Sequence, residues 1–208
     1  TGNRLCSVPF SHECTCLGDS VTRTALIDKA VSLRDCHRIT KIEIRSAVEN
    51  PLFHEMNAFC THILELSQNL EETWKQLDKS SVRWAVKKAE KLGVSVTSST
   101  DIEDLKEFYE LNCITKQNLG VPCHPYEFFK NLFSILDGHV RLYLAQHEGN
   151  IIAGGVMEYY RDQVLYGYGA ADPNHLDLHP YNAFIWKSIE DACVNGCRTY
   201  DFGRTSYD

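Results

Sequence analysis

The sequence has no long apolar run and no recognisable secretory leader. None of its hydrophobic stretches approaches the roughly 18 to 20 residues that a helix needs to cross a bilayer. Its first residues lack the extended apolar core of a signal peptide. We therefore expect no transmembrane segment and a cytoplasmic location.

Cysteine and histidine motifs that bind metal are also missing. The nine cysteines include no CxxC pair, which favours reduced thiols packed as small hydrophobes. His175 and His179 are four positions apart, but Pro180 argues against a helix there and no H-E-x-x-H pattern accompanies them. We expect no metal site.

Positive charge is scarce relative to negative charge. The chain has 21 Lys and Arg against 28 Asp and Glu, a formal net charge of −7. Binding a nucleic acid along its length requires Lys and Arg gathered on one face. We therefore expect no DNA partner, although a local basic groove is compatible with this balance.

What the sequence does contain fits a globular protein of one large domain or two small ones. The residues are 43% hydrophobic and 24% charged over a length of 208. In the first part, the patterns predict a helix over 22–35, strands over 39–45 and 61–66, and two helices from residue 70 that break near 79–80 and stop at Gly93. In the second part, they predict helices over 101–117, 125–136 and 181–194 and strands over 140–146, 151–159, 164–170 and 199–202. Helices followed by a meander of strands, then strand, helix and strand, indicate an α+β fold.

Four segments carry a family resemblance, in the same order along the chain. They are Trp74-x2-Leu77-x5-Arg83-x3-Lys87-Lys88-Ala89-x3-Gly93-Val94-x-Val96, Leu119–Pro122 followed by Phe128-Phe129, Tyr166–Ala170, and Gly196-x3-Tyr200-Asp201-Phe202-Gly203-Arg204. Together they resemble the FemAB-type peptidyltransferase relatives. Ser7-Val8-Pro9-Phe10 is similar to a strand-entry segment in the first domain of these proteins.

The resemblance implies a GNAT-like fold, part of a tandem pair, with a mostly antiparallel sheet flanked by helices. Residues 1–97 would be the C-terminal part of a first GNAT-like domain with a basic helical hairpin, and residues 98–208 the N-terminal and central part of a second. The sequence is thus expected to be a piece of a longer protein, since relatives commonly continue into a segment with a Phe-Lys pair.

The resemblance also implies transfer of an acyl or aminoacyl group onto an amine of a cell-envelope precursor, either a peptidoglycan peptide or an exopolysaccharide-linked intermediate. The alternative is a catalytically inactive GNAT-like binding module, which keeps a substrate groove without chemistry. Turnover with some donor would distinguish the two.

Asp201 and Arg204 are the predicted catalytic residues, in an acid-glycine-arginine turn at a strand end. Asp201 would orient or deprotonate the amine, and Arg204 would bind an anionic group or the developing oxyanion. The alternative is an Asp-Arg pair that only ties the strand end to its neighbour.

A row of basic residues is the predicted substrate-binding feature. Lys75, Lys79, Arg83 and Lys87 recur every four residues and would line one side of a continuous helix. Lys79, Arg83 and Lys87 would hold phosphates of a nucleotide-linked precursor or of tRNA. A solvated helix face is the competing interpretation.

The donor is predicted from the loop over 172–180. GNAT enzymes that use acetyl-CoA usually cradle its diphosphate on a glycine-rich turn before a helix. This loop has no glycine and two acids, which disfavours acyl-CoA and leaves aminoacyl-tRNA as the expected donor, with no tightly bound cofactor. Tyr168 and Asn182 flank the loop and are predicted to contact substrate.

Overall fold

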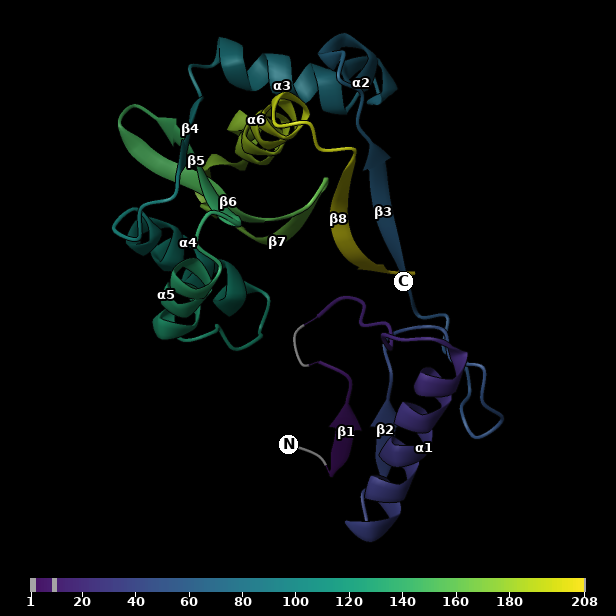
Figure 1. The fold of residues 1–208 in the computed structure, drawn as a ribbon. Helices are drawn as coiled ribbons and strands as arrows, with labels where there is room; N and C mark the ends of the chain where they lie inside the picture. The colour runs from purple at the N-terminus through teal and green to yellow at the C-terminus, as the bar shows by residue number, and fades with distance from the viewer. Residues whose placement is uncertain (1–2, 9–10, 208) are drawn as a thin grey trace. The chain divides into compact units, whose positions relative to one another are not determined.

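The computed structural model describes residues 3–8 and 11–207 and divides into two compact units (Figure 1). The first unit comprises residues 1–60 with 204–208, and the second comprises residues 61–203. Pro9 and Phe10, from the predicted strand-entry segment, lie outside the described residues.

The first unit contains two parallel strands joined by a helix. Strand β1 (Arg4–Cys6) pairs with β2 (Lys41–Glu43), and α1 (Ser20–Cys36) connects them. The helix begins where the Asp19 side chain accepts a hydrogen bond from the amide of Thr22, which satisfies a first-turn donor. The helix predicted over 22–35 and the strand predicted over 39–45 are both present, as α1 and β2.

The second unit is built on a mixed sheet with helices on both faces. Its helices are α2 (Leu70–Gln76), α3 (Val82–Lys91), α4 (Leu105–Asn118), α5 (Tyr126–Ile135) and α6 (Pro180–Val194), with a 3-10 turn η1 (Pro173–Leu178). The strands of the six-stranded sheet are β3 (Phe59–Glu65), β4 (Ser95–Ser99), β5 (Val140–His147), β6 (Asn150–Tyr160), β7 (Gln163–Ala171) and β8 (Thr199–Ser206). Residues 59–60 of β3 and 204–206 of β8 belong to the first unit.

The strand order is β3-β8-β7-β6-β5-β4. Strands β4 to β7 pair antiparallel, whereas β7 and β8 pair in parallel. The predicted α+β class, with a mostly antiparallel sheet flanked by helices, is confirmed.

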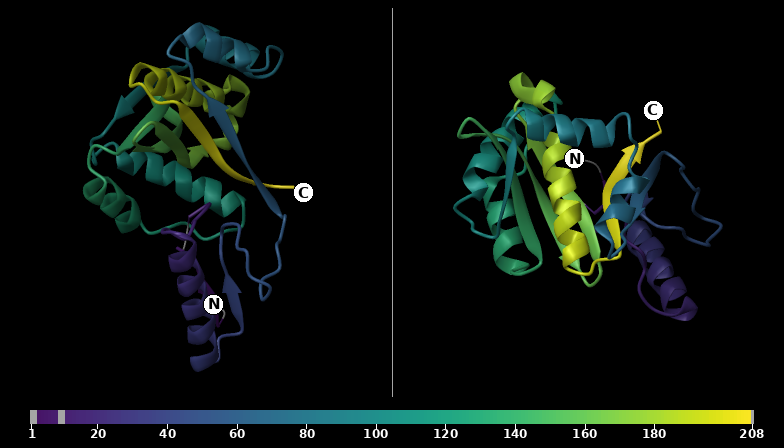
Figure 2. Two further views of the ribbon diagram at one scale, coloured as in Figure 1. Left: turned by 45° about the vertical axis from the view of Figure 1, so that its right-hand side comes forward. Right: turned by 90° about the horizontal axis from the view of Figure 1, so that it is seen from above.

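Each face of this sheet buries its own apolar cluster. Helix α6 covers one face, where Tyr143, Met157, Phe184 and Tyr200 are buried, and α3 packs on α6. Helices α4 and α5 cover the other face through Phe108 and other apolar residues (Figures 1 and 2). Because both faces are buried, the central strands are nearly continuous apolar runs.

A β-bulge in β7 decides which side chains reach which face. Val156 of β6 lies opposite Tyr168, but its neighbour Met157 lies opposite Tyr166, so Gly167 is an extra residue without a partner of its own. In a regular strand with Gly167 paired, Tyr166 and Tyr168 would share a face. With the bulge, Tyr166 packs in the cluster under α6 and Tyr168 packs in the cluster under α4 and α5.

Three predictions from the sequence are compared with a different arrangement in the structure. Strand β8 continues to Ser206, so the predicted turn after Phe202 is wrong and residues 203–204 lie within the strand. Helices α2 and α3 are separate elements, so the basic row does not lie on one continuous helix. The domain division predicted after residue 97 falls inside β4, while the compact units divide at residue 60; the tandem arrangement stays a prediction.

Candidate functional site

A carboxylate without a cationic partner lies on the α4/α5 face of the sheet. Glu158 of β6 is half-buried, and among the described residues no Lys, Arg or His lies within ion-pair distance of it. Burial raises the pKa of Glu158, because the charged form is poorly solvated there. A carboxylate with a raised pKa is a stronger base than an ordinary carboxylate.

The sheet register places Asp201 on the same face as Glu158. Glu158 pairs with Leu165, and Leu165 in turn pairs with Asp201. Directly paired residues project to the same side of a sheet, and two strand spacings amount to roughly 10 Å. The two carboxylates therefore flank β7 from its two neighbouring strands.

Asp201 is held by a local hydrogen bond. Its Oδ1 atom accepts a hydrogen bond from the backbone amide of Gly203 at 2.7 Å. Gly203 has φ of +81°, a conformation that glycine adopts without the strain of a side chain. One oxygen of Asp201 is thus engaged by the backbone, which fixes the direction of the carboxylate.

Tyr168 completes this group beside an aromatic wall. Its ring centroid lies 5.1 Å from that of Phe129, 5.8 Å from Phe128 and 5.9 Å from His124. Burial, and secondarily the charge of Glu158, raises the pKa of Tyr168 to about 12. The hydroxyl therefore keeps its proton at neutral pH and is able to donate a hydrogen bond.

Gly167 allows the close approach of Glu158. A Cβ atom at Gly167 would lie only 2.7 Å from Oε1 of Glu158. The extra residue in the bulge thus has two effects: it turns Tyr168 toward this face and leaves space for the carboxylate. Glu158, Tyr168 and Asp201 together supply a proton acceptor, a hydrogen-bond donor and a second negative charge.

Arg204, the second predicted catalytic residue, is engaged elsewhere. Its guanidinium lies 3.9 Å from the ring centroid of Phe59, a cation–π contact within the first compact unit. Asp201 belongs to the second unit and has its own contact with Gly203. The catalytic role of either residue stays a prediction.

The three predicted basic residues lie in different surroundings. Lys79 is exposed in the break between α2 and α3. Arg83, in the first turn of α3, is half-buried, and its Nε atom is buried without a hydrogen-bond partner. Lys87 is exposed, one turn further along the same helix, and borders a pocket with Trp74 and Trp186. Because the helix is interrupted, only Arg83 and Lys87 share a helical face.

Tyr168 and Asn182, which flank the predicted donor loop, lie on opposite sides of the sheet. Tyr168 packs under α4 and α5, whereas Asn182 is in the first turn of α6. The structure therefore does not bring the two side chains together around one ligand group. Their contacts with substrate stay predictions.

The loop between β7 and α6 does not fit a diphosphate. Asp172 caps η1 by accepting a hydrogen bond from the amide of Asn174 and also contacts His175 at 2.9 Å. Helix α6 begins with Pro180, which has no amide hydrogen to offer an anion. A second acid, Asp177, lies in the same segment. Carboxylates and a missing donor oppose an anionic ligand here.

Glu158 is the residue that the sequence interpretation missed. A charged residue in a strand as apolar as Asn150–Tyr160 is a usable signal. Its position on the same face as Asp201 depends on the register of three strands, which cannot be read from a local sequence pattern.

Two further properties concern the described residues as a set. In residues 3–8 and 11–207, no three His, Cys, Asp or Glu side chains gather as a metal-binding group. Over the same ranges, no helix combines the length and apolar character needed to cross a membrane.

Comparison with known proteins identifies the family. Residues 78–208 match the family described as the acetyltransferase (GNAT) domain. The chain is 24% identical over 133 residues to UDP-N-acetylmuramoylpentapeptide-lysine N(6)-alanyltransferase of Weissella viridescens, a match that covers 64% of this chain and 39% of that protein. The chain thus spans well under half the length of this curated relative.

Solved structures show the same fold. The crystal structure of FemX superposes with a TM-score of 0.69 at 18% identity, over 99% of this chain and 72% of that one. The structure of L-PGS from Bacillus licheniformis gives a TM-score of 0.61 at 11% identity, over 100% of this chain and 64% of that one. The predicted resemblance to FemAB-type, GNAT-like proteins is confirmed. Since the family match covers more than half of the sequence, the chain belongs to the acetyltransferase (GNAT) domain family.

Proposed function

We propose that this chain contributes to an enzyme that transfers an aminoacyl group onto an amine of a cell-envelope precursor. The observation that carries the proposal is the pair of carboxylates, Glu158 and Asp201, that flank β7 on one face of the sheet. The similarity to an alanyltransferase that acts on the lysine of a peptidoglycan precursor supports the choice of reaction.

Glu158 would act as the proton acceptor. An attacking amine is protonated at neutral pH and must lose a proton before it reacts. The raised pKa of Glu158 makes it a stronger base than an ordinary carboxylate. Asp201 would attract and orient the incoming ammonium group, since its direction is fixed by Gly203.

Tyr168 would act on the carbonyl group. Its protonated hydroxyl would donate a hydrogen bond to the carbonyl oxygen as negative charge develops there. The C–N bond then forms and the C–O ester bond to the donor breaks. The ammonium group loses two protons in becoming an amide: one would pass through Glu158 to the leaving hydroxyl oxygen and the other would go to solvent, so protons and charges balance.

Aminoacyl-tRNA is the proposed donor, because the loop before α6 does not fit the diphosphate of acyl-CoA. A peptidoglycan peptide is the proposed acceptor, by similarity to the relative. Arg204, Lys79, Arg83 and Lys87 stay predicted anion-binding residues, and Asn182 a predicted substrate contact. A cytoplasmic location stays a prediction.

The test is a transfer assay with the complete gene product. Alanyl-, seryl- and glycyl-tRNA and acetyl-CoA are each offered with the lysine-containing UDP-N-acetylmuramoyl-pentapeptide, and product mass is followed. A mass increase of one aminoacyl group from a tRNA donor is expected. Transfer from acetyl-CoA alone would refute the proposed donor. If no donor gives a product, either with this acceptor or with a total extract of envelope precursors as acceptor, the inactive binding module is favoured.

A further inference from the structure

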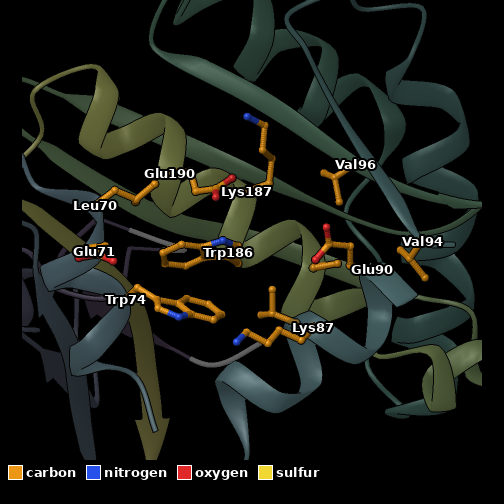
Figure 3. Close-up of a pocket in the computed structure, with 12 residues that line it drawn as sticks. Leu70, Glu71, Trp74, Lys87, Glu90, Val94, Val96, Trp186, Lys187 and Glu190 are labelled. Atoms are coloured by element: carbon orange, nitrogen blue, oxygen red, sulfur yellow. The ribbon is translucent and has the colours of Figure 1, made fainter. Parts of the chain in front are cut away.

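A pocket lies on the α6 side of the sheet, opposite the face that carries Glu158. It has a volume of about 500 Å³ and is lined by residues of α2, α3 and α6 and the segment around β4 (Figure 3). All of its lining residues belong to the second compact unit. Its volume is within the range of small-molecule sites.

Two tryptophans form the main wall of this pocket. The rings of Trp74 from α2 and Trp186 from α6 have centroids 4.5 Å apart at an interplanar angle of 56°. Both side chains are only half-buried. Val86, Val94 and Val96 add aliphatic surface to the lining. Such a wall offers an apolar ligand group a large contact area.

The charged residues that line the pocket divide into those that have an ion-pair partner and those that have none within 4.0 Å among the described residues. Lys187 donates a hydrogen bond to Asp191 at 2.8 Å, and Figure 3 shows its amine directed away from the indoles. Glu71 pairs with Lys75 at 3.3 Å. Among the described residues, no ion-pair partner lies within 4.0 Å of the three remaining charges. These three are Lys87, Glu90 and Glu190.

Of the two pocket carboxylates without an ion-pair partner in the described part of the chain, Glu190 is half-buried and Glu90 is exposed. Burial raises the pKa of Glu190 most, and the nearby charges of Asp191 and Glu90 raise it further, against the effects of Lys187 and Trp186. Two carboxylates that repel one another beside indole rings provide a favourable location for an ammonium group. Lys87, whose amine is turned toward Trp74 in Figure 3, provides a positive charge on the same pocket.

We propose that this pocket binds a free amino acid with an apolar side chain. The ammonium group would lie between Glu90 and Glu190, the carboxylate would contact Lys87, and the side chain would pack on Trp74 and Trp186. A zwitterion of this kind matches both signs of free charge and the apolar wall together. A simple amine would leave Lys87 unmatched, and a simple acid would leave two carboxylates unmatched.

The proposal is independent of the proposed transfer reaction. The pocket is lined by helices on the α6 side, whereas Glu158 and Asp201 face α4 and α5. Binding is therefore measurable without any turnover.

Tryptophan fluorescence is the direct measurement. The chain has three tryptophans, and Trp84 does not line the pocket. In a Trp84→Phe background the emission therefore reports on Trp74 and Trp186 alone. L-leucine, L-leucine methyl ester, isoamylamine and 4-methylpentanoate are titrated to about 10 mM, the range of weak small-molecule binding.

L-leucine is expected to give a saturable change. The ester, amine and acid are each expected to bind about tenfold more weakly or worse, because a charge-assisted contact is lost. Lys87→Gln and Glu190→Gln should weaken leucine binding by a similar factor. Lys91→Gln and Glu110→Gln, exposed residues of α3 and α4 that do not line the pocket, should leave it unchanged.

Two results would overturn the proposal. One is the absence of a saturable change with L-leucine while circular dichroism shows a folded protein. The other is equal binding of isoamylamine and L-leucine together with no effect of Lys87→Gln, which would make the site a cation pocket. Calorimetry of the unsubstituted protein with L-leucine checks that the Trp84→Phe background has not altered the site.

Discussion

Polar side chains on the two faces of the sheet differ in whether they have partners within the protein. On the α6 face, the hydroxyl of Tyr143 lies 2.8 Å from that of Tyr159 and donates to Asp191 at 3.1 Å. The hydroxyls of Ser188 and Tyr200 are 2.8 Å apart under the same helix. On the α4/α5 face, Glu158 is half-buried, and no cation in the part of the chain that the structure describes lies within ion-pair distance of it.

This difference separates polar groups that hold the fold from polar groups available for chemistry. A buried polar group usually has a hydrogen-bond partner, because an unpaired one costs free energy. The α6 network meets that condition within the protein. Glu158 does not, and an unpaired carboxylate with a raised pKa is typical of a functional site.

Removing the charge of Glu158 should have the largest effect on activity. Glu158→Gln keeps the shape of the side chain but cannot accept the proton, so transfer should fall roughly 10²- to 10⁴-fold. The rate of product formation, followed by mass spectrometry, measures this loss. Glu110→Gln, on the exposed side of α4, is the matched control and should keep full activity. Full activity in Glu158→Gln would remove the proposed base.

A glycine-to-alanine substitution on each face should distinguish effects on the free energy of unfolding from effects on the transfer rate. A Cβ at Gly155 would lie 2.6 Å from the buried ring of Phe184, so Gly155→Ala should cost about 1–3 kcal/mol of unfolding free energy. A Cβ at Gly167 would come too close to the end of the Glu158 side chain, which is able to move, and would lie at an ordinary 3.5 Å from the backbone oxygen of Val156.

Gly167→Ala should therefore cost less than about 1 kcal/mol and still reduce transfer, because the carboxylate is displaced. Urea unfolding and the transfer assay, run on both variants, make the comparison. Equal stability losses in the two variants would contradict the view that Gly155 lies in a closely packed core whereas Gly167 lies beside a movable side chain.

Removing one hydroxyl on each face gives a smaller contrast. Tyr143→Phe deprives Asp191 and Tyr159 of a hydrogen-bond partner, and should destabilise the protein by about 1–2 kcal/mol. Tyr168→Phe should change stability by less than about 0.5 kcal/mol, yet lower the transfer rate because the carbonyl oxygen loses a donor. Chemical unfolding and kinetics measure the two effects. A Tyr168→Phe variant with normal kinetics would limit Tyr168 to packing.

The smallest effect is a dependence of stability on pH. The folded protein raises the pKa of Glu158 above its ordinary value of 4.5, so the folded state holds that proton more tightly than the unfolded state does. As pH rises from below 4.5 through the folded pKa, the native carboxyl therefore reduces stability.

Glu158→Gln removes this loss. The melting temperature of the variant, relative to the unsubstituted protein, should be higher at pH 7 than at pH 4. Thermal scans at the two pH values measure the difference. A difference of the opposite sign would mean that an unseen partner stabilises the charged form.

The sequence predicted most of the elements because their patterns are local. Helical spacing after residue 70 and the short apolar runs in residues 140–170 depend only on residues a few positions apart, and both agree with α3 and β5 to β7. The helix break indicated at Lys79-Ser80 falls within the basic row and is incompatible with one continuous basic face. The Asp78 side chain accepts bonds from Ser80 and Ser81 there, which ends any continuous helix.

The candidate site was only partly predictable. Asp201 and Tyr168 were identified from motifs, but their relation to Glu158 follows from pairing between distant strands. The bulge at Gly167 reverses the alternation expected from the sequence. No pattern within β7 alone states where such a residue lies.

The bulge at Gly167 also bears on how β7 responds to a change in length. Upstream of it, even-numbered positions such as Val164 and Tyr166 belong to the α6 side, and downstream the even-numbered Tyr168 and Ala170 belong to the other side. Deleting Gly167 would leave Tyr166 opposite Met157 and Tyr168 opposite Val156, so regular alternation would return and each tyrosine would keep its face. Insertion of one residue that takes no partner of its own thus sends two otherwise identical side chains to opposite layers of the protein.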